Sequence, residues 1–324
     1  MGIRLPIAIV LFVAMSRLLC AEPDARTTAR LSRLRDSVEV SLDVPYAATD
    51  DPRQTLNLLL PRNRKTRRLP VIVYIHGGAW RHGDKSGGVG ALAKPVASGE
   101  YAGVTVGYRL SGSTIWPGQI HDCKAAIRWI RAHADQHGFD PDRIGVMGTS
   151  AGGHLAAMLG TSADAVEMNG DVGAFTDASS KVACVVDFYG PVDLLRMNEL
   201  ALPESTFDHD AATSPESELL GGPIHDRREA ARSASPLTYV TPDDPPFFIL
   251  HGTRDPLVGV GQSKLLHAAL GNAGVESTLI TVNRGLHGKN FGPDTNKLVD
   301  EFFAHHLLGR TTTWEDQTVE AIDR

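Results

Sequence analysis

The chain has few cysteines and no long apolar run, and neither sign of charge dominates it. Its 324 residues include three cysteines, and no Cys-x-x-Cys or His-Glu-x-x-His spacing occurs, which argues against a zinc site. The net charge of −6 is mildly acidic, so we expect no nucleic-acid partner. With 42% hydrophobic and 22% charged residues, most of the chain has the composition of a folded globular protein rather than a disordered one.

Residues 1–21 are expected to be a targeting segment. Arg4 precedes an apolar run from Leu5 to Met15, and these eleven residues are too few to span a bilayer. That length fits the hydrophobic region of a secretory signal that is cleaved after Ala21. An uncleaved anchor is the alternative. We therefore expect a secreted or periplasmic protein with no stable membrane insertion after cleavage.

Cys123 and Cys184 remain after this cleavage. Both lie within apolar segments of regular periodicity, so we expect two buried free thiols. An oxidising compartment would also permit a disulfide between them.

The remaining chain alternates between strand and helix patterns. Continuous apolar runs are typical of strands that are buried on both faces, as in parallel sheets. Such runs occur at Val71–Ile75, Val104–Val106, Ile144–Met147, Val182–Phe188 and Phe247–Leu250, and Val275–Val282 is a further strand pattern. Helical stripes cover 120–134 and 298–307, and alternation at 38–46 and 54–60 predicts an antiparallel strand pair. This order predicts one α/β domain over residues 22–310, with a mostly parallel sheet of about eight strands and helices on both faces.

Three segments depart from this alternation. Residues 194–236 contain several prolines and glycines, and so long an excursion between two strands is commonly a lid or the wall of a pocket. The basic loop at 62–68 could bind an acidic polymer, although a solvated turn is its expected role. The polar residues 311–324 are expected to form a loose tail.

The strongest functional signal is the Gly-x-Ser-x-Gly motif of residues 148–152, with Ser150 at its centre. It follows the run Ile144–Met147 and precedes a helix of small residues, which is the strand–turn–helix context of a nucleophile elbow. Such a turn strains its central residue and lifts the hydroxyl above the carboxyl edge of the sheet. Ser150 is therefore the expected nucleophile.

A serine hydroxyl needs an adjacent base, and the base needs a third group that orients it. Asp255 follows the run Phe247–Leu250, and His287 follows Val275–Val282. Both therefore lie on loops at the same edge of the sheet as Ser150, in the chain order serine, acid, histidine. We predict that Asp255 and His287 complete a catalytic triad. Taken singly, Asp255 could be a turn former and His287 a histidine of a surface loop.

Other residues could fill these two roles. Asp193 also follows a strand pattern, although capping of the next helix is its expected role. The rival bases are His76, His121, His154 and His251. Of these, His76 and His251 lie directly at strand ends and are expected to stabilise the adjoining loops. His154 lies inside a helix.

The segment His76–Trp80 follows an apolar run and contains two consecutive glycines. Acyl transfer requires backbone N–H donors for a tetrahedral oxyanion, and glycines let the chain approach it closely. We expect donors from Gly78, Ala79 and Ala151, with Gly77 shaping the oxyanion-hole turn. A plain glycine turn is the alternative.

Two tryptophans are candidates for substrate binding. Trp80 follows the glycine loop, and Trp116 lies in the segment before a helical stripe. Both could line a sugar or aromatic site, and Trp116 could equally belong to the core.

Together these residues resemble the α/β-hydrolase superfamily, in particular its esterase/lipase branch and the bifunctional feruloyl and acetylxylan esterase-like (BD-FAE-like) group. The likeness runs from about Val44 to Leu308. Besides the loops above, it includes Tyr46, Gln54–Pro61, Tyr108–Leu110, Asp122–Ala132, Phe188–Leu194 and Ser235–Tyr239. The departures from the pattern are Ala79 in place of a third glycine, Thr149, Leu286 and Asn57, and none removes a catalytic atom.

The resemblance implies the α/β-hydrolase fold and an exported carboxylic ester hydrolase that works through an acyl-enzyme, without a cofactor or metal. Its partner would be a small-molecule or oligosaccharide ester, and an acetyl or feruloyl ester of a carbohydrate is the expected substrate. A short-chain lipid esterase and an arylformamidase are the alternatives within the enzyme class. A non-catalytic binding protein is the alternative of another class, and the presence of Ser150, Asp255 and His287 counts against it.

Overall fold

The structure is a computed structural model that describes residues 36–322. The predicted signal segment, residues 1–21, lies outside the described residues, so export stays a prediction. Within residues 36–322, no helix has both the length and the apolar character needed to cross a bilayer.

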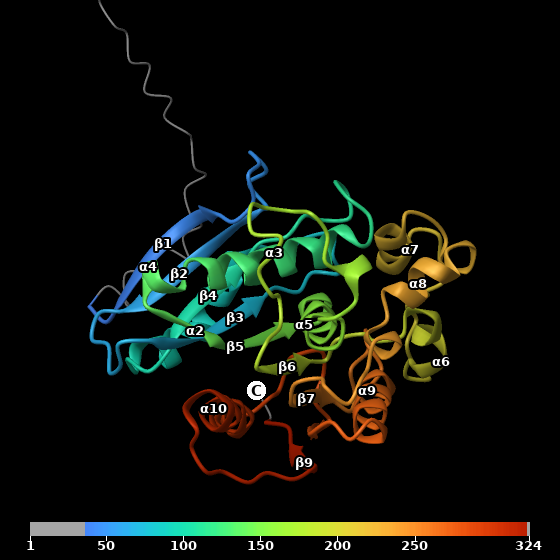
Figure 1. Ribbon diagram of the computed structural model, residues 1–324. Coiled ribbons are helices and arrows are strands. Elements are labelled where there is room, and N and C mark those ends of the chain that lie inside the picture. The colour runs from blue at the N-terminus through green and yellow to red at the C-terminus, as the bar shows by residue number, and fades with distance from the viewer. Residues whose placement is uncertain (1–35, 323–324) are drawn as a thin grey trace, which may run out of the picture.

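A nine-stranded sheet runs through the molecule in the order β1-β2-β4-β3-β5-β6-β7-β8-β9 (Figure 1). The first two strands, β1 (Val38–Pro45) and β2 (Thr55–Pro61), are antiparallel to each other, and β2 is antiparallel to β4 (Ala102–Val106). All further pairings are parallel. These strands are β3 (Leu69–Ile75), β5 (Phe139–Thr149), β6 (Cys184–Phe188), β7 (Phe247–Gly252), β8 (Ser277–Asn283) and β9 (Gln317–Glu320). The mostly parallel α/β sheet agrees with the prediction from the sequence.

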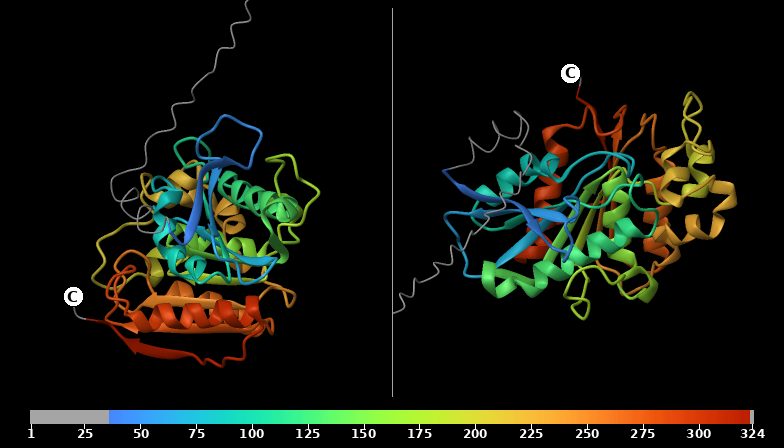
Figure 2. Two further views of the ribbon diagram at one scale, coloured as in Figure 1. Left: turned by 90° about the vertical axis from the view of Figure 1, so that its left-hand side faces the viewer. Right: turned by 90° about the horizontal axis from the view of Figure 1, so that it is seen from above.

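Helices cover both faces of this sheet. One face carries α2 (Val89–Ala97) and α10 (Pro293–Leu308), and the other carries α3 (Gly118–Ala132), α5 (Ala151–Thr161) and α9 (Gly261–Asn272). The right-hand view of Figure 2 shows α10 on one side of the strands and the green α3 and α5 on the other. A four-residue helix, α4 (Ala134–His137), follows α3.

Burial on two faces explains the continuous apolar runs. Along β3, Val71 and Val73 pack into the core beneath α3 and α5, whereas Ile72 packs into the core beneath α2 and α10. Successive side chains of a strand point to opposite faces, so every position of a doubly covered strand is apolar.

The two cysteines are buried free thiols, as predicted. Cys123 on α3 belongs to the core of one sheet face, and Cys184 on β6 belongs to the core of the other. The sheet therefore separates them, and no disulfide forms.

The basic loop at 62–68 is an exposed turn. Its cations find local partners, since Arg68 lies 2.6 Å from Asp135 and Lys65 lies 3.5 Å from Glu100. This arrangement agrees with the solvated turn that the sequence predicts.

The C-terminal segment corrects one expectation. The sequence predicts a loose tail over residues 311–324, yet Gln317–Glu320 form β9, which pairs with β8 at the sheet edge. Polar side chains join the two strands: the Thr281 and Thr318 hydroxyl groups lie 2.8 Å apart, and the Asn283 amide donates to Glu320 at 3.0 Å. An exposed edge strand needs no apolar pattern, so the sequence carries little signal for it. With β9, the sheet has nine strands within residues 36–322, close to the predicted number of about eight.

The excursion between β6 and β7 contains three short helices, α6 (Met197–Leu200), α7 (Pro215–Leu220) and α8 (Arg228–Ser233). In Figure 1 they lie beyond the carboxyl ends of the parallel strands. Two ion pairs connect this insertion to loops at that edge: Arg81 lies 3.3 Å from Glu218, and Arg254 lies 2.6 Å from Glu204. The insertion thus lies over the edge at which the sequence places the site.

Candidate active site

Ser150 is the single residue of the turn between β5 and α5. Its φ of 55° and ψ of −122° lie in a region that residues with a side chain rarely adopt. The Ser150 N–H donates to the Phe188 carbonyl at 2.9 Å, and its carbonyl accepts from the His154 N–H at 3.0 Å. The flanking backbone thus holds Ser150 in a strained elbow.

Both motif glycines are required by close approach of the backbone. A Cβ atom on Gly148 would lie 2.0 Å from the Gly152 carbonyl oxygen, and a Cβ atom on Gly152 would lie 2.2 Å from the Ile75 carbonyl oxygen. Any side chain at either position would therefore open the turn.

His287 and Asp255 form a hydrogen-bonded pair. The Nδ1–H of His287 donates to Oδ2 of Asp255 at 2.6 Å. Oδ1 of Asp255 accepts from the backbone N–H groups of Leu257 at 2.8 Å and Val258 at 2.9 Å. This arrangement fixes the tautomer of His287 and leaves its Nε2 as the basic nitrogen.

The Asp255 carboxylate is buried but stays ionised. Burial raises its pKa, but hydrogen bonds from His251 and His287 outweigh burial and hold the pKa well below its usual value. An ionised acid at this position stabilises the imidazolium that forms when His287 takes up a proton.

Ser150 and His287 line one cavity of about 420 Å³. The loop after β3 contributes further lining, as do the insertion and the loop that carries Asp255. The other lining residues are Ala79, Trp80, Arg81, His82, Ala151, Pro191, Phe207, His209, Pro215, Glu216, Leu257 and Val258. The structure thus brings the predicted nucleophile and base to one cavity of the size of a small-molecule site.

The loop after β3 has an unusual backbone. Gly78, Ala79 and Trp80 all have positive φ, at 122°, 53° and 55°. A Cβ atom on Gly78 would lie 2.1 Å from the His82 carbonyl oxygen, and one on Gly77 would lie 2.6 Å from the backbone of the nucleophile strand. Only glycine therefore fits at either position.

The N–H groups of this loop are available as donors. Within residues 36–322, the N–H groups of Gly78 and Ala79 donate no hydrogen bond. The Ala151 N–H belongs to the first residue of α5 and has no partner inside the helix. Ala79 and Ala151 also line the cavity. These are the three donors that the sequence predicts for an oxyanion hole.

The rival bases stabilise loops or lie away from the cavity of Ser150. His76 stacks on Tyr108 with ring centroids 4.3 Å apart, and burial lowers its pKa to about 4. His154 accepts a hydrogen bond from the Trp80 indole at 3.1 Å, and its Nε2 lies 2.7 Å from the Ala234 carbonyl. Burial lowers the pKa of His154 to about 4 as well. None of the rival bases lines the cavity of Ser150.

Asp193, the rival acid, is a helix cap. Its side chain accepts from the Leu195 N–H at 3.1 Å, and the Gln262 side chain accepts from its backbone N–H at 2.7 Å. Asp193 does not line the cavity of Ser150. This is the capping role that the sequence predicts.

The two tryptophans lie in different places. Trp80 is 2% exposed and lines the cavity, whereas Trp116 is buried and is not among the residues that line it. The Trp116 indole donates to the Ser233 hydroxyl at 3.1 Å. The structure therefore puts Trp116 in the core, the alternative that its sequence context leaves open.

Two features of the site are not evident in the sequence. Tyr189, with a φ of 46°, places its ring against His287 at a centroid distance of 4.6 Å. His209 and Glu216 bring a buried polar pair to the cavity from the insertion. Tyr189 could have been found because it directly follows a strand, but no pattern marks His209 or Glu216.

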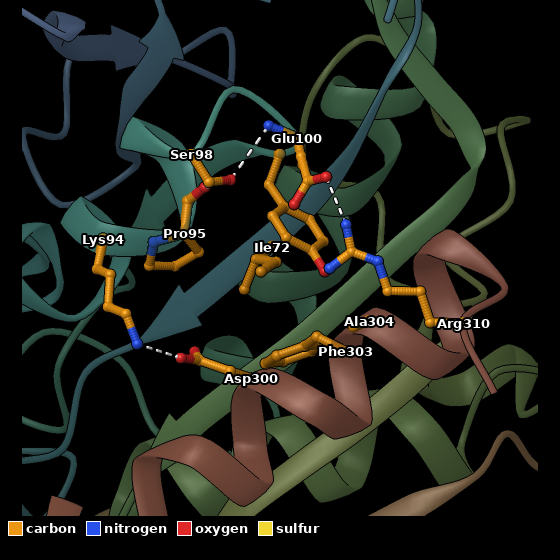
Figure 3. Close-up of a pocket in the computed structure, with 10 residues that line it drawn as sticks. Ile72, Lys94, Pro95, Ser98, Glu100, Asp300, Phe303, Ala304 and Arg310 are labelled. Atoms are coloured by element: carbon orange, nitrogen blue, oxygen red, sulfur yellow. Dashed lines mark hydrogen bonds and ion pairs between the residues drawn. The ribbon is translucent and has the colours of Figure 1, made fainter. Parts of the chain in front are cut away.

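A second cavity, of about 180 Å³, lies at the opposite edge of the sheet, between α2 and α10 (Figure 3). Its charged side chains pair with one another: Lys94 lies 2.7 Å from Asp300, and Arg310 bonds to Glu100. Within residues 36–322, no cluster of three or more His, Cys, Asp or Glu side chains could hold a metal ion. The charged side chains of this second cavity thus form two ion pairs with one another.

A model of the BD-FAE family matches residues 56–270, which is more than half of the chain. The chain belongs to the BD-FAE family. Esterase LipC of Mycobacterium tuberculosis (strain H37Rv) is 34% identical over 216 residues, covering 66% of this chain and 51% of LipC. This BD-FAE chain thus spans about half the length of the curated relatives it matches.

Solved structures show the same architecture as this BD-FAE chain. A truncated carbohydrate esterase from gut microbiota superposes with a TM-score of 0.76 at 32% identity, covering 84% of this chain and 97% of that one. Esterase B from Lactobacillus rhamnosis superposes with a TM-score of 0.71 at 26% identity, covering 88% and 91%. The fold is the α/β-hydrolase fold, and the family is one of esterases.

Proposed function

We propose that the protein is a secreted serine carboxylic ester hydrolase that acts through an acyl-enzyme on acyl esters of carbohydrates. The observation that carries the proposal is the 2.6 Å hydrogen bond between Asp255 and His287, whose ring lines one cavity with the strained Ser150. This is the arrangement that activates a serine hydroxyl, because a base fixed by an acid lines the same cavity as the nucleophile.

In the first half-reaction, the Ser150 hydroxyl oxygen attacks the ester carbonyl carbon and His287 Nε2 takes the hydroxyl proton. The carbonyl oxygen becomes an oxyanion, which accepts hydrogen bonds from the N–H groups of Gly78, Ala79 and Ala151. The intermediate collapses with cleavage of the bond to the alcohol oxygen, and His287 returns the proton to that oxygen. The alcohol leaves, and the acyl group stays on Ser150.

In the second half-reaction, His287 takes a proton from a water molecule, and the water oxygen attacks the acyl carbon. Collapse of this second intermediate returns the proton to the Ser150 oxygen and releases the carboxylic acid. Asp255 remains ionised throughout and stabilises the imidazolium, in agreement with its lowered pKa. These steps need no metal or cofactor.

A carbohydrate substrate is supported by the family and by the similarity to a carbohydrate esterase from gut microbiota. Secretion is supported by the apolar run in residues 1–21 alone. The insertion forms one wall of the cavity and so contributes to the choice of the alcohol moiety.

The test is the release of acetate from acetylated xylan and of ferulate from feruloylated oligosaccharide by residues 22–324, with Ser150→Ala as control. Release that disappears in Ser150→Ala supports the proposal. If only p-nitrophenyl acetate is cleaved through Ser150, the serine mechanism stands and the polysaccharide substrate is wrong. A short-chain triacylglycerol and an N-formyl arylamine, assayed in parallel, separate a lipid esterase from an arylformamidase.

A further inference from the structure

The cavity of Ser150 contains a second pair of polar side chains, which the hydrolysis steps do not use. His209 and Glu216 are each 3% exposed, and both line the cavity. The Nδ1–H of His209 donates to Oε1 of Glu216 at 2.9 Å. The other carboxylate oxygen, Oε2, is buried and has no hydrogen-bond partner within residues 36–322. A buried acceptor without a donor, in a residue that lines a cavity, points to a donor on the ligand.

The local fold holds this pair in place. Glu216 lies in the first turn of α7, where the Ser214 side chain accepts from the Ser217 N–H at 3.0 Å and caps the helix. The Ser217 hydroxyl donates to the Ala211 carbonyl at 2.9 Å. This bond ties the loop that carries His209 to the helix that carries Glu216. The pair is therefore preorganised, which lowers the entropic cost of binding a ligand.

The surroundings of the pair are mostly apolar. Pro191, Pro215 and Leu257 also line the cavity, as does Phe207, which is 39% exposed. The ring centroids of Phe207 and His209 lie 4.6 Å apart. A polyhydroxylated ligand matches this combination, because its C–H surface packs on the apolar wall and its O–H groups supply hydrogen-bond donors.

We propose that His209 and Glu216 recognise a free hydroxyl group on the alcohol moiety of the ester. This inference rests on the proposed ester hydrolysis and narrows it to alcohols that carry at least one further hydroxyl. The hydroxyl donates to Oε2 of Glu216, while His209 holds the carboxylate in position. Sugars and glycerol both carry a free hydroxyl group beside the esterified one, so the test includes an ester of each alcohol.

Two acetate esters separate this recognition from hydrolysis itself. A monoacetylated methyl β-xylopyranoside has free hydroxyl groups beside the ester, whereas tetrahydropyran-3-yl acetate has the same acyl group on a similar ring without hydroxyl groups. We would measure kcat and KM on both esters for the wild type, Glu216→Leu, Glu216→Gln and His209→Gln. Glu229→Gln, an exposed acid on α8 of the same insertion, is the matched control.

A hydrogen bond to a charged group predicts a loss of about 10- to 100-fold in kcat/KM on the xyloside for Glu216→Leu. We expect a smaller loss for Glu216→Gln and for His209→Gln, and no change for Glu229→Gln. Hydrolysis of the tetrahydropyranyl ester should be unchanged in all four variants. If Glu216→Leu does not fold, the near-isosteric Glu216→Gln carries the test.

Equal losses on both esters in the Glu216 variants would make the pair structural and overturn the inference. The inference would also be overturned if the wild type did not prefer the acetylated xyloside to the tetrahydropyranyl ester. Glycerol monoacetate distinguishes a sugar from glycerol as the alcohol moiety. If the Glu216 variants lose as much kcat/KM on glycerol monoacetate as on the xyloside, the site recognises a glycerol-type alcohol. If the loss is confined to the xyloside, the site recognises a sugar. If the wild type cleaves no ester, p-nitrophenyl acetate included, the proposed function itself is wrong and the inference falls with it.

Discussion

His251 shares the Asp255 carboxylate with His287. The Nε2 atom of His251 lies 3.3 Å from Oδ2 of Asp255, the same oxygen that accepts the Nδ1–H of His287 at 2.6 Å. His251 is also anchored, since its Nδ1 lies 2.7 Å from the Ser263 hydroxyl and its Nε2 lies 2.8 Å from the Val258 carbonyl. The predicted triad acid, Asp255, therefore contacts two histidines. Their hydrogen bonds explain why the pKa of this buried carboxyl group stays low.

The choice between the two candidate acids can be tested directly. Asp255→Asn keeps the shape of the side chain but removes the charge and the acceptor that fixes the His287 tautomer. We expect kcat on p-nitrophenyl acetate to fall by about 10³- to 10⁴-fold, as in a serine protease whose triad acid is changed in this way. Asp193→Asn, which alters only a helix cap, should cost little activity. A larger loss in Asp193→Asn than in Asp255→Asn would contradict the assignment.

The oxyanion loop predicts a selective effect on kcat. A methyl group on Gly78 would collide with the His82 carbonyl, and its φ of 122° disfavours any side chain. Gly78→Ala should therefore displace the N–H donors and lower kcat by about 10²- to 10³-fold with a smaller change in KM. Gly87→Ala is the control, because a Cβ atom there meets nothing within 4 Å. Equal kinetics in Gly78→Ala and the wild type would rule out this loop as the oxyanion hole.

Asp187 on β6 predicts how stability varies with pH. It is buried, it accepts one hydrogen bond from the Gly190 N–H at 2.8 Å, and its Oδ2 has no partner within the described residues. Burial raises its pKa from 3.8 to about 6. Because the folded-state pKa exceeds the unfolded-state pKa, the stability contributed by neutral Asp187 is complete below pH 3.8. It is lost as the pH rises to about 6.

Asp187→Asn should remove this pH dependence. Between pH 3.8 and 7, the free energy of unfolding of the wild type should fall relative to that of the variant by about 3 kcal/mol. Urea unfolding across this pH range measures the difference. Asp177→Asn, in an exposed loop, should follow the wild type. Parallel curves for wild type and Asp187→Asn would show that Asp187 has an ordinary pKa.

Local sequence predicts the parts of the site that depend on backbone geometry. A Cβ atom on Gly148 or Gly152 would lie only 2.0 or 2.2 Å from a neighbouring carbonyl oxygen, so both positions require glycine and the motif itself indicates the elbow. The positions of Asp255 and His287 follow from the apolar strands that precede them, because parallel strands bring their carboxyl ends to one edge. The parallel core was predictable for the same reason.

Tertiary packing decides the rest. His209 and Glu216 meet because a loop folds against the short helix α7, and neither residue belongs to a periodic pattern. The strand β9 has polar side chains on an exposed edge, so it resembles a loop in sequence. The role of His251 depends on a contact with Asp255 that its position at a strand end does not reveal.

The central claim is that Ser150 is a nucleophile activated by His287. The most direct measurement is the reaction of the protein with a fluorophosphonate, followed by intact mass and peptide mapping. We expect a single adduct on Ser150 in the wild type, none in Ser150→Ala, and strongly slowed labelling in His287→Ala. An adduct on another residue, or ester hydrolysis that survives in Ser150→Ala, would contradict this claim.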